Sequence, residues 1–315
     1  MEQKSAMEAN YRRKGCQRDW FWRGWHIRYT YLRPVKGQSG SDADRPTLPI
    51  LLLHGFGSAL GQWRSNLQAL NESHCVYALD FLGFGASQKA PAAYNVNLWA
   101  DLVYDFWCCF IGQPAVIVGH SLGSLVGLTA AIDHPEIALG LALFTLPDAQ
   151  TSQPPSWARA MEQAFASPVL LWPLFKLVTQ RWLLRSVLQS IYIRRELVDD
   201  ELVALFATPP RDKGALDTFC RLARSRSHSH DYSPKTVAQM LPQLSIPVLL
   251  LWGNQDRIVP LAGFRKLLDQ LQLSPVPPQF QLVEIDNAGH CAYDEYPAIV
   301  NQQILTWIQS AVVSA

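Results

Sequence analysis

The sequence predicts an α/β fold, with a mostly parallel central sheet flanked by helices and an inserted helical cap. Short apolar runs that end at glycine or polar residues recur along the chain, and helix-like stretches alternate with them. One long interval, residues 148–240, contains helix-like stretches alone. With 315 residues, 49% of them hydrophobic, the chain is large enough to bury the core that such a fold needs.

Six apolar runs have the length and composition of strands that are buried on both faces. They occupy residues 48–53, 75–79, 115–118, 139–144, 247–252 and 280–285. Helix-like stretches separate the early runs, at 62–70, 98–111 and 125–133, which predicts parallel neighbours. Upstream, residues 25–32 alternate apolar and polar side chains with period two, which predicts an antiparallel strand at the edge of the sheet.

The helical interval 148–240 is predicted to be a cap inserted into a core of residues 20–147 and 241–315, and residues 1–19 are predicted to form a flexible tail. The cap carries an apolar stripe at helical spacing. Four of its residues are candidates for substrate contact: Leu171, Trp172, Leu174 and Phe175. Three roles stay open, because such a stripe can pack on the core, line a tunnel for an apolar substrate or touch a bilayer.

Charge and composition exclude several classes of protein. The 27 Lys and Arg residues are balanced by 26 Asp and Glu residues, so no overall field attracts nucleic acid. The six cysteines lack the spacing of metal ligands, and we expect neither a metal nor a cofactor. The polar N-terminus lacks the apolar centre of a signal peptide, and no apolar run reaches the length of a membrane span, which predicts a cytoplasmic protein.

A serine lies between two glycines where one of the buried runs meets a helix. The run 115–118 is followed by Gly-His-Ser-Leu-Gly and then by a helix that we expect to start near Ser124. This strand–turn–helix context is typical of a nucleophile elbow, in which the glycines avoid clashes in a tight turn and the serine oxygen is exposed above the sheet. Ser121 is therefore the candidate nucleophile. The alternative is a serine that only caps the helix.

A serine hydroxyl needs a base and a carboxylate that orients the base, and both follow Ser121 in the expected order. Asp256 follows the run 247–252, and His290 follows the run 280–285. Asp148, which follows the run 139–144, is the alternative acid. Five other histidines are weaker candidates for the base because they lie in turn motifs, at a helix end or in a polar loop: His54, His120, His134, His228 and His230.

Acyl transfer also needs fixed donors for the developing oxyanion, and backbone N–H groups serve this purpose. One candidate is the N–H of Leu122, directly after the nucleophile. The other is the N–H of Phe56, in the loop His-Gly-Phe-Gly-Ser after the first buried run. An ordinary glycine-rich turn is the alternative interpretation of that loop.

Several stretches of the chain together resemble an α/β-hydrolase of the plant and cyanobacterial branch that includes pheophytinase and chlorophyll dephytylase. They are LLLHGFGSALGQWRSNLQAL, ALDFLGFGASQKA, VGHSLGS, LLLWGNQDRIVP, AGHCAYDEYPAIVNQQILTWI and, in the cap, IYIRRELVDDELVALFATPPRDKGALDTFCRLA. The likeness runs from residue 20 to the end of the chain. The elbow departs from the G-N-S-x-G-G pattern of that branch at His120 and Ser124.

The resemblance implies the α/β-hydrolase fold and the hydrolysis of a carboxylic ester with a long apolar alcohol, such as the phytyl ester of a chlorophyll pigment. The substrate would be a lipophilic small molecule, attacked through an acyl-enzyme on Ser121. Peripheral contact with a membrane, such as a thylakoid membrane, stays open, and so does the oligomeric state.

Other functions are compatible with the same serine, acid and histidine. A hydrolase that cleaves carbon–carbon bonds, a thioesterase and a hydrolase of small esters would all carry the same triad. A binding protein of this fold without catalytic activity is the remaining class. A fluorophosphonate probe distinguishes that class, because a protein that only binds would not be labelled at Ser121.

Overall fold

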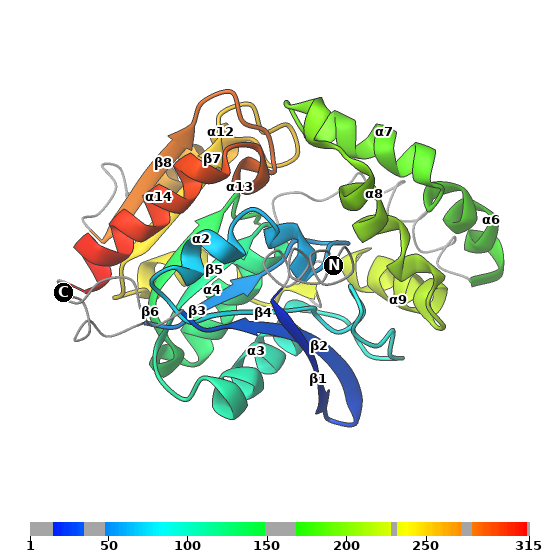
Figure 1. The fold of residues 1–315 in the computed structure, drawn as a ribbon, viewed down its shortest axis with the longest axis horizontal. Coiled ribbons are helices and arrows are strands. Elements are labelled where there is room, and N and C mark those ends of the chain that lie inside the picture. Colours follow the sequence, from blue (N-terminus) through cyan, green and yellow to red (C-terminus); the bar gives the residue numbers. More distant parts are fainter. Residues whose placement is uncertain (1–14, 35–47, 149–167, 228–231, 272–278, 314–315) are drawn as a thin grey trace, which may run out of the picture.

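A computed structural model describes residues 15–34, 48–148, 168–227, 232–271 and 279–313. Within these residues, eight strands form one sheet in the order β1-β2-β4-β3-β5-β6-β7-β8 (Figure 1). The strands are β1 (Cys16–Trp22), β2 (Trp25–Leu32), β3 (Ile50–Leu53), β4 (Val76–Leu79), β5 (Ala115–His120), β6 (Ala138–Phe144), β7 (Val248–Gly253) and β8 (Phe280–Ile285). All neighbours from β4 to β8 are parallel, whereas β2 pairs antiparallel with β1 and with β4. The predicted α/β class with a mostly parallel sheet is therefore confirmed.

The N-terminal hairpin starts earlier than the sequence indicated. Strand β1 begins at Cys16, inside the stretch 1–19 that we expected to be a tail. It pairs with β2 through a tight turn at Arg23 and Gly24, both of which have positive φ, as a two-residue hairpin turn requires. The first four residues of β1 are exposed, so the strand lacks the apolar pattern that would have identified it.

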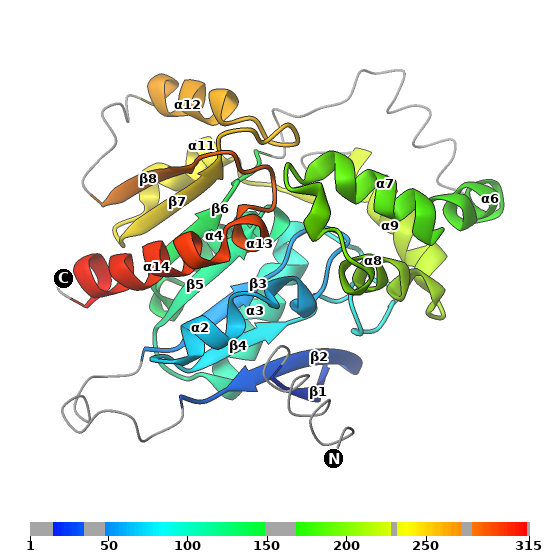
Figure 2. The ribbon, with the colours of Figure 1, turned by 45° about the horizontal axis from the view of Figure 1, so that its top comes forward.

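Side chains of successive strand residues feed two hydrophobic cores, one on each face of the sheet. Along β3, Leu51 and Leu53 join one core, and Ile50 and Leu52 join the other. The first core is closed by helices α3 (Val96–Phe110), α4 (Leu122–Asp133), α11 (Val237–Met240) and α12 (Leu261–Gln270). The second is closed by α2 (Leu67–Asn71), α13 (Ala292–Glu295) and α14 (Pro297–Trp307), which lie in front of the sheet in Figure 2.

The single helix predicted over 62–70 is divided in the structure. A short 3₁₀ segment, η1 (Leu60–Trp63), precedes α2, and Asn66 lies between them. The Asn66 side chain donates hydrogen bonds to the backbone oxygen of Tyr293 and to the side chain of Asn301, so it bonds across to α13 and α14. These distant partners favour the break over a continuous helix.

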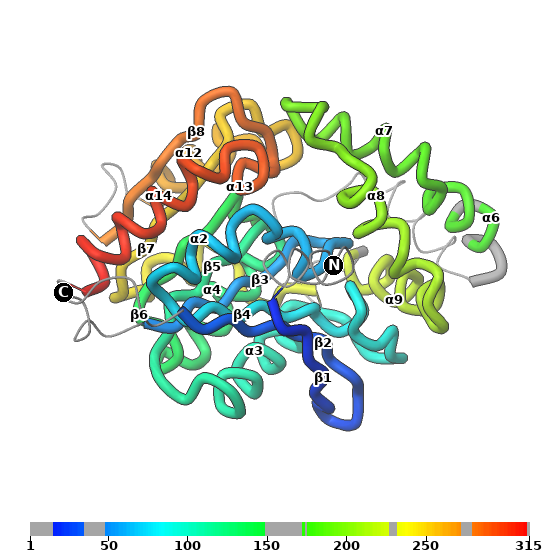
Figure 3. The backbone as a smooth tube through the Cα atoms, viewed as in Figure 1, coloured from blue at the N-terminus to red at the C-terminus, as the bar shows by residue number. Residues whose placement is uncertain are grey.

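The long interval between β6 and β7 is helical in the residues that are described. It contains α6 (Pro168–Val178), α7 (Arg181–Ile191), α8 (Asp200–Ala207), α9 (Ala215–Ser227) and the short α11. Buried residues of α7 and α8 join the second core, whereas Figure 3 shows the chain of α6 and the start of α7 reaching outward from the core. Residues 149–167 of the interval predicted to be a helical cap lie outside the described residues. None of the helices described is both long and apolar enough to cross a bilayer.

Candidate active site

The turn between β5 and α4 holds Ser121 in a strained conformation. Its φ is 51° and its ψ is −113°, a region that residues other than glycine rarely occupy. A Cβ on Gly123 would lie 2.2 Å from the backbone oxygen of Leu53, and one on Gly119 would lie 2.5 Å from the oxygen of Gly123, so both positions require glycine. The Ser121 side chain makes no capping hydrogen bond to α4, in contrast to the alternative of a simple helix cap.

Asp256 and His290 come from neighbouring loops and are hydrogen-bonded to each other. His290 Nδ1 lies 2.9 Å from Asp256 Oδ2, and the Asp256 side chain is fully buried. The other carboxylate oxygen, Oδ1, accepts hydrogen bonds from the backbone N–H groups of Ile258 (2.8 Å) and Val259 (3.0 Å). An ionised carboxylate only accepts, so Nδ1 of His290 carries the proton and Nε2 is left as the basic nitrogen. The alternative acid, Asp148, is not the partner of this ring nitrogen.

The loops that carry Asp256 and His290 are also joined through their main chains. The N–H of Asn254 donates to the oxygen of Ile285 (3.1 Å), and the N–H of Gln255 donates to the oxygen of Ala288 (3.0 Å). These bonds continue the parallel pairing of β7 and β8 past the ends of the strands. The relative position of the acid and the histidine is therefore fixed by the sheet.

His120, the residue before Ser121, contacts His290 directly. Its Nε2 lies 3.0 Å from the backbone oxygen of His290, and the two ring centroids are 4.7 Å apart. Burial, together with a smaller effect of His290, lowers the pKa of His120 well below its usual value of 6.5. Because a carbonyl oxygen only accepts, the single proton of this neutral ring is on Nε2. The nucleophile elbow is thus tied to the main chain of the histidine without adding a positive charge beside it.

The loop that carries Phe56 packs against the elbow. A Cβ on Gly55 would lie 2.6 Å from Nδ1 of His120, and the Gly55 N–H donates to the Gln62 side chain at 3.0 Å. Leu122 is the first residue of α4, where backbone N–H groups have no acceptor within the helix. The structure therefore places the Phe56 loop against the turn that carries Ser121, and Leu122 follows Ser121 in that turn. The binding of an oxyanion by their N–H groups stays a prediction.

A buried carboxylate that sequence reasoning missed connects the histidine loop to the cap. Glu295 accepts hydrogen bonds from the N–H groups of Gly289 (2.7 Å), Ile193 (2.9 Å) and Arg194 (2.9 Å). Burial raises the pKa of this carboxyl, although these three N–H donors oppose the shift. The available sequence signal was a pair of acids, Asp294 and Glu295, within an otherwise apolar closing motif. The other missed residue is His120, for which the sequence indicated only the role of a weaker candidate base.

The four cap residues predicted to contact substrate all belong to α6, which Figures 1 and 2 place at the outer end of the cap. Trp172 is 51% exposed, and Nζ of Lys176 lies 4.6 Å from the centroid of its ring. Phe175 packs against Phe219 of α9, with ring centroids 5.6 Å apart. The side chains of Leu171 and Leu174 lie outside the described residues. Contact between these residues and substrate stays a prediction.

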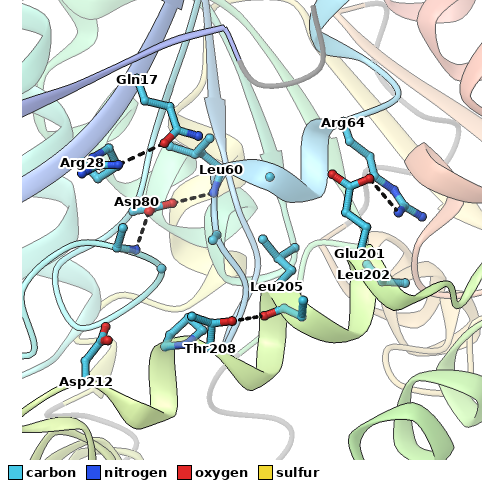
Figure 4. Close-up of a pocket in the computed structure, with 16 residues that line it drawn as sticks. Gln17, Arg28, Leu60, Arg64, Asp80, Glu201, Leu202, Leu205, Thr208 and Asp212 are labelled. Atoms are coloured by element: carbon cyan, nitrogen blue, oxygen red, sulfur yellow. Dashed lines mark hydrogen bonds and ion pairs between the residues drawn. The ribbon is translucent and has the colours of Figure 1, made fainter. Parts of the chain in front are cut away.

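A cavity of about 320 Å³ lies between η1, the N-terminal hairpin and α8 (Figure 4). Asp80 is buried at its wall and accepts hydrogen bonds from the N–H groups of Leu60 (2.6 Å) and Ala86 (2.7 Å); burial raises its pKa to about 6. The lining residues Arg28 and Arg64 are both engaged in ion pairs. Its lining does not include Ser121, Asp256 or His290, and its charges already have partners, which indicates a structural seam between core and cap.

Residues 49–297 match the alpha/beta hydrolase fold family, and the chain belongs to that family. It is 26% identical over 266 residues to the uncharacterized hydrolase YugF of Bacillus subtilis, covering 82% of this chain and 89% of that protein. It is 25% identical over 322 residues to the chloroplastic pheophytinase of Arabidopsis thaliana, covering 88% of this chain and 64% of that protein. The resemblance to pheophytinase expected from the sequence is thereby confirmed.

Two further similarities are to a hydrolase with another substrate and to a solved structure of the same fold. The chain is 27% identical over 267 residues to the 2-hydroxymuconate semialdehyde hydrolase of a Pseudomonas species, covering 79% of this chain and 83% of that protein. The crystal structure of CarC, a serine hydrolase involved in carbazole degradation, superimposes with a TM-score of 0.71 at 19% identity, covering 93% of this chain and 98% of that one. The second likeness concerns the fold alone.

Proposed function

We propose that this protein is a serine hydrolase that cleaves a carboxylic ester through an acyl-enzyme on Ser121. The observation that carries the proposal is the hydrogen bond between the buried Asp256 and Nδ1 of His290, next to an elbow where Ser121 is held at positive φ. A hydroxyl is activated when a neighbouring imidazole accepts its proton, and the imidazole accepts it well when a carboxylate fixes its tautomer.

The proposed reaction has two halves. In the first, Nε2 of His290 takes the proton of Ser121 while Oγ attacks the ester carbonyl, and the alcohol then leaves with the proton from His290. In the second, water attacks the acyl-enzyme with His290 again as base, which releases the acid and restores Ser121. The N–H groups of Phe56 and Leu122 stabilise the oxyanion in both halves, and each such donor is typically worth about 3 kcal/mol of barrier.

A lipophilic alcohol is the leaving group that we propose. The sequence likeness to pheophytinase supports this choice, and so does the composition of α6, where the run Val-Leu-Leu-Trp-Pro-Leu-Phe contains no charged residue. An apolar cap gives an advantage to a long alcohol, because each buried methylene contributes about 0.8 kcal/mol. The phytyl ester of a chlorophyll pigment belongs to this class.

Carbon–carbon bond hydrolysis is the second candidate, and the likeness to 2-hydroxymuconate semialdehyde hydrolase favours it. Thioesters and small esters would be cleaved by the same residues. The experiment that separates these reactions compares kcat/KM for p-nitrophenyl esters of graded chain length, chlorophyll, pheophytin and a ring-fission product of a catechol, with the Ser121→Ala protein as the blank. We expect the long esters and the pigments to be preferred. A preference for the ring-fission product or for acetate esters would contradict the proposal.

A further inference from the structure

The outermost part of the cap combines exposed aromatic side chains with cations. We call this part the cap corner; it consists of Trp172, Lys176, Leu177, Arg181 and Trp182, at the junction of α6 and α7. Trp172, Leu177 and Trp182 are 51%, 49% and 66% exposed. Large apolar side chains are rarely left in water at this density without a partner, so the cap corner has the composition of a contact surface.

The charge of the cap corner has one sign. Residues 168–191, which form α6, α7 and the link between them, include Lys176, Arg181 and Arg185 and no acidic residue. The whole chain has a net charge of only +1, so the positive charge of this segment is a local feature. Arg181 and Arg185 both form ion pairs with the exposed Asp200 of α8, so two guanidinium groups share one carboxylate, and Lys176 is exposed beside the ring of Trp172.

From this combination we infer that the cap corner binds the surface of an anionic lipid bilayer. Tryptophan rings favour the boundary between headgroups and acyl chains, and Lys or Arg beside them are attracted to acidic headgroups. The ammonium group of Lys176 already lies over the ring of Trp172, so both groups would enter the headgroup region together. Figures 1 and 2 show α6 and the start of α7 at the outer end of the cap.

The charge pattern also argues against a second copy of the chain as the occupant. A symmetric dimer through the cap corner would bring Lys176 and Arg181 close to the same residues of the partner. Like charges at an interface oppose association, whereas an acidic membrane supplies the complementary sign. The inference does not depend on the proposed reaction, because lipid binding requires no turnover.

The test is vesicle co-sedimentation of the full chain carrying Ser121→Ala, with phosphatidylcholine vesicles and with phosphatidylcholine–phosphatidylglycerol vesicles. We expect binding to the second kind only. Lys176→Gln with Arg181→Gln should lower the partition coefficient about 30-fold, since each cation near the surface contributes about fivefold. Trp182→Ala should lower it about tenfold through lost apolar burial. The matched control is Phe21→Ala, which removes a ring that is 71% exposed on the N-terminal hairpin.

Three results would overturn the inference. The first is equal binding, or none, to the two kinds of vesicle. The second is a loss of binding in Phe21→Ala as large as that in Trp182→Ala. The third is a change of oligomeric state in the cap-corner variants on gel filtration, which would assign the surface to a second copy. Circular dichroism of each variant confirms that it is folded.

Discussion

Replacing Asp256 by Asn removes one charge and changes one hydrogen-bonding group, and the structure fixes how the new side chain lies. The N–H groups of Ile258 and Val259 both donate to Oδ1, so the amide oxygen of the asparagine must face them. Its NH₂ group then takes the position of Oδ2, opposite Nδ1 of His290. The NH₂ group and a protonated Nδ1 are both donors and cannot bond to each other. The imidazole proton therefore moves to Nε2, which can then no longer accept the proton of Ser121.

We expect kcat of Asp256→Asn to fall about 10⁴-fold, the effect seen when a triad aspartate is replaced in this way. This corresponds to about 5 kcal/mol of activation free energy, with little change in KM. Thermal unfolding should change by only a few degrees, because Oδ1 keeps both backbone donors. The assay is steady-state hydrolysis of a p-nitrophenyl ester, with Asp148→Asn as the matched control. A loss below tenfold in Asp256→Asn would refute the assignment. A larger loss in Asp148→Asn would transfer the role to Asp148.

Three further predictions concern the cap, a buried carboxylate and pH. Replacing Leu171 and Leu174 by Ser should flatten the rise of kcat/KM with ester chain length and spare short esters; a rise that persists would exclude the two residues from the substrate site. Glu295→Gln should lower the free energy of unfolding by about 1–3 kcal/mol, because Gln offers one oxygen to three donors; an unchanged urea midpoint would contradict this. Burial lowers the pKa of His54 to about 4 and that of His120 well below 6.5. The unfolded chain therefore takes up protons at these histidines first as the pH falls, and each histidine should cost about 0.8 kcal/mol of stability between about pH 7.5 and pH 6. The folded Asp80, with its pKa of about 6, takes up protons over the same range and offsets about 0.4 kcal/mol of this loss. Urea denaturation measures the net loss, and equal stability at both pH values would contradict the prediction.

The central strands β3, β5 and β7 were predictable because their residues are buried on both faces of the sheet. The runs at 48–53 and 247–252 in the sequence became β3 and β7 within two residues of the expected ends. Strand β1 was missed for the opposite reason. It lies at the edge of the sheet with polar side chains in water, so its sequence has no alternation of apolar and polar residues that would identify a strand. Its strand conformation is stabilised by pairing with β2.

The pairing of Asp256 with His290 could be expected from sequence because parallel strands end at the same edge of the sheet, where their loops meet. The contacts of His120 and Glu295 could not. Both depend on which main-chain atoms of distant segments come within hydrogen-bonding distance: the oxygen of His290 for one, and the N–H groups of Ile193 and Arg194 for the other. Such contacts are set by the packing of the cap and the last loop.

The central claim is that Ser121 is a nucleophile, and intact-mass analysis after reaction with a fluorophosphonate tests it most directly. The account predicts a single adduct, assigned to Ser121 by peptide mapping, with ester hydrolysis lost in the same proportion as the label appears. Both the adduct and the hydrolysis should be absent from Ser121→Ala, which fits the turn and should remain folded. Hydrolysis that continues in the fully labelled protein, or that persists in purified Ser121→Ala, would contradict the account.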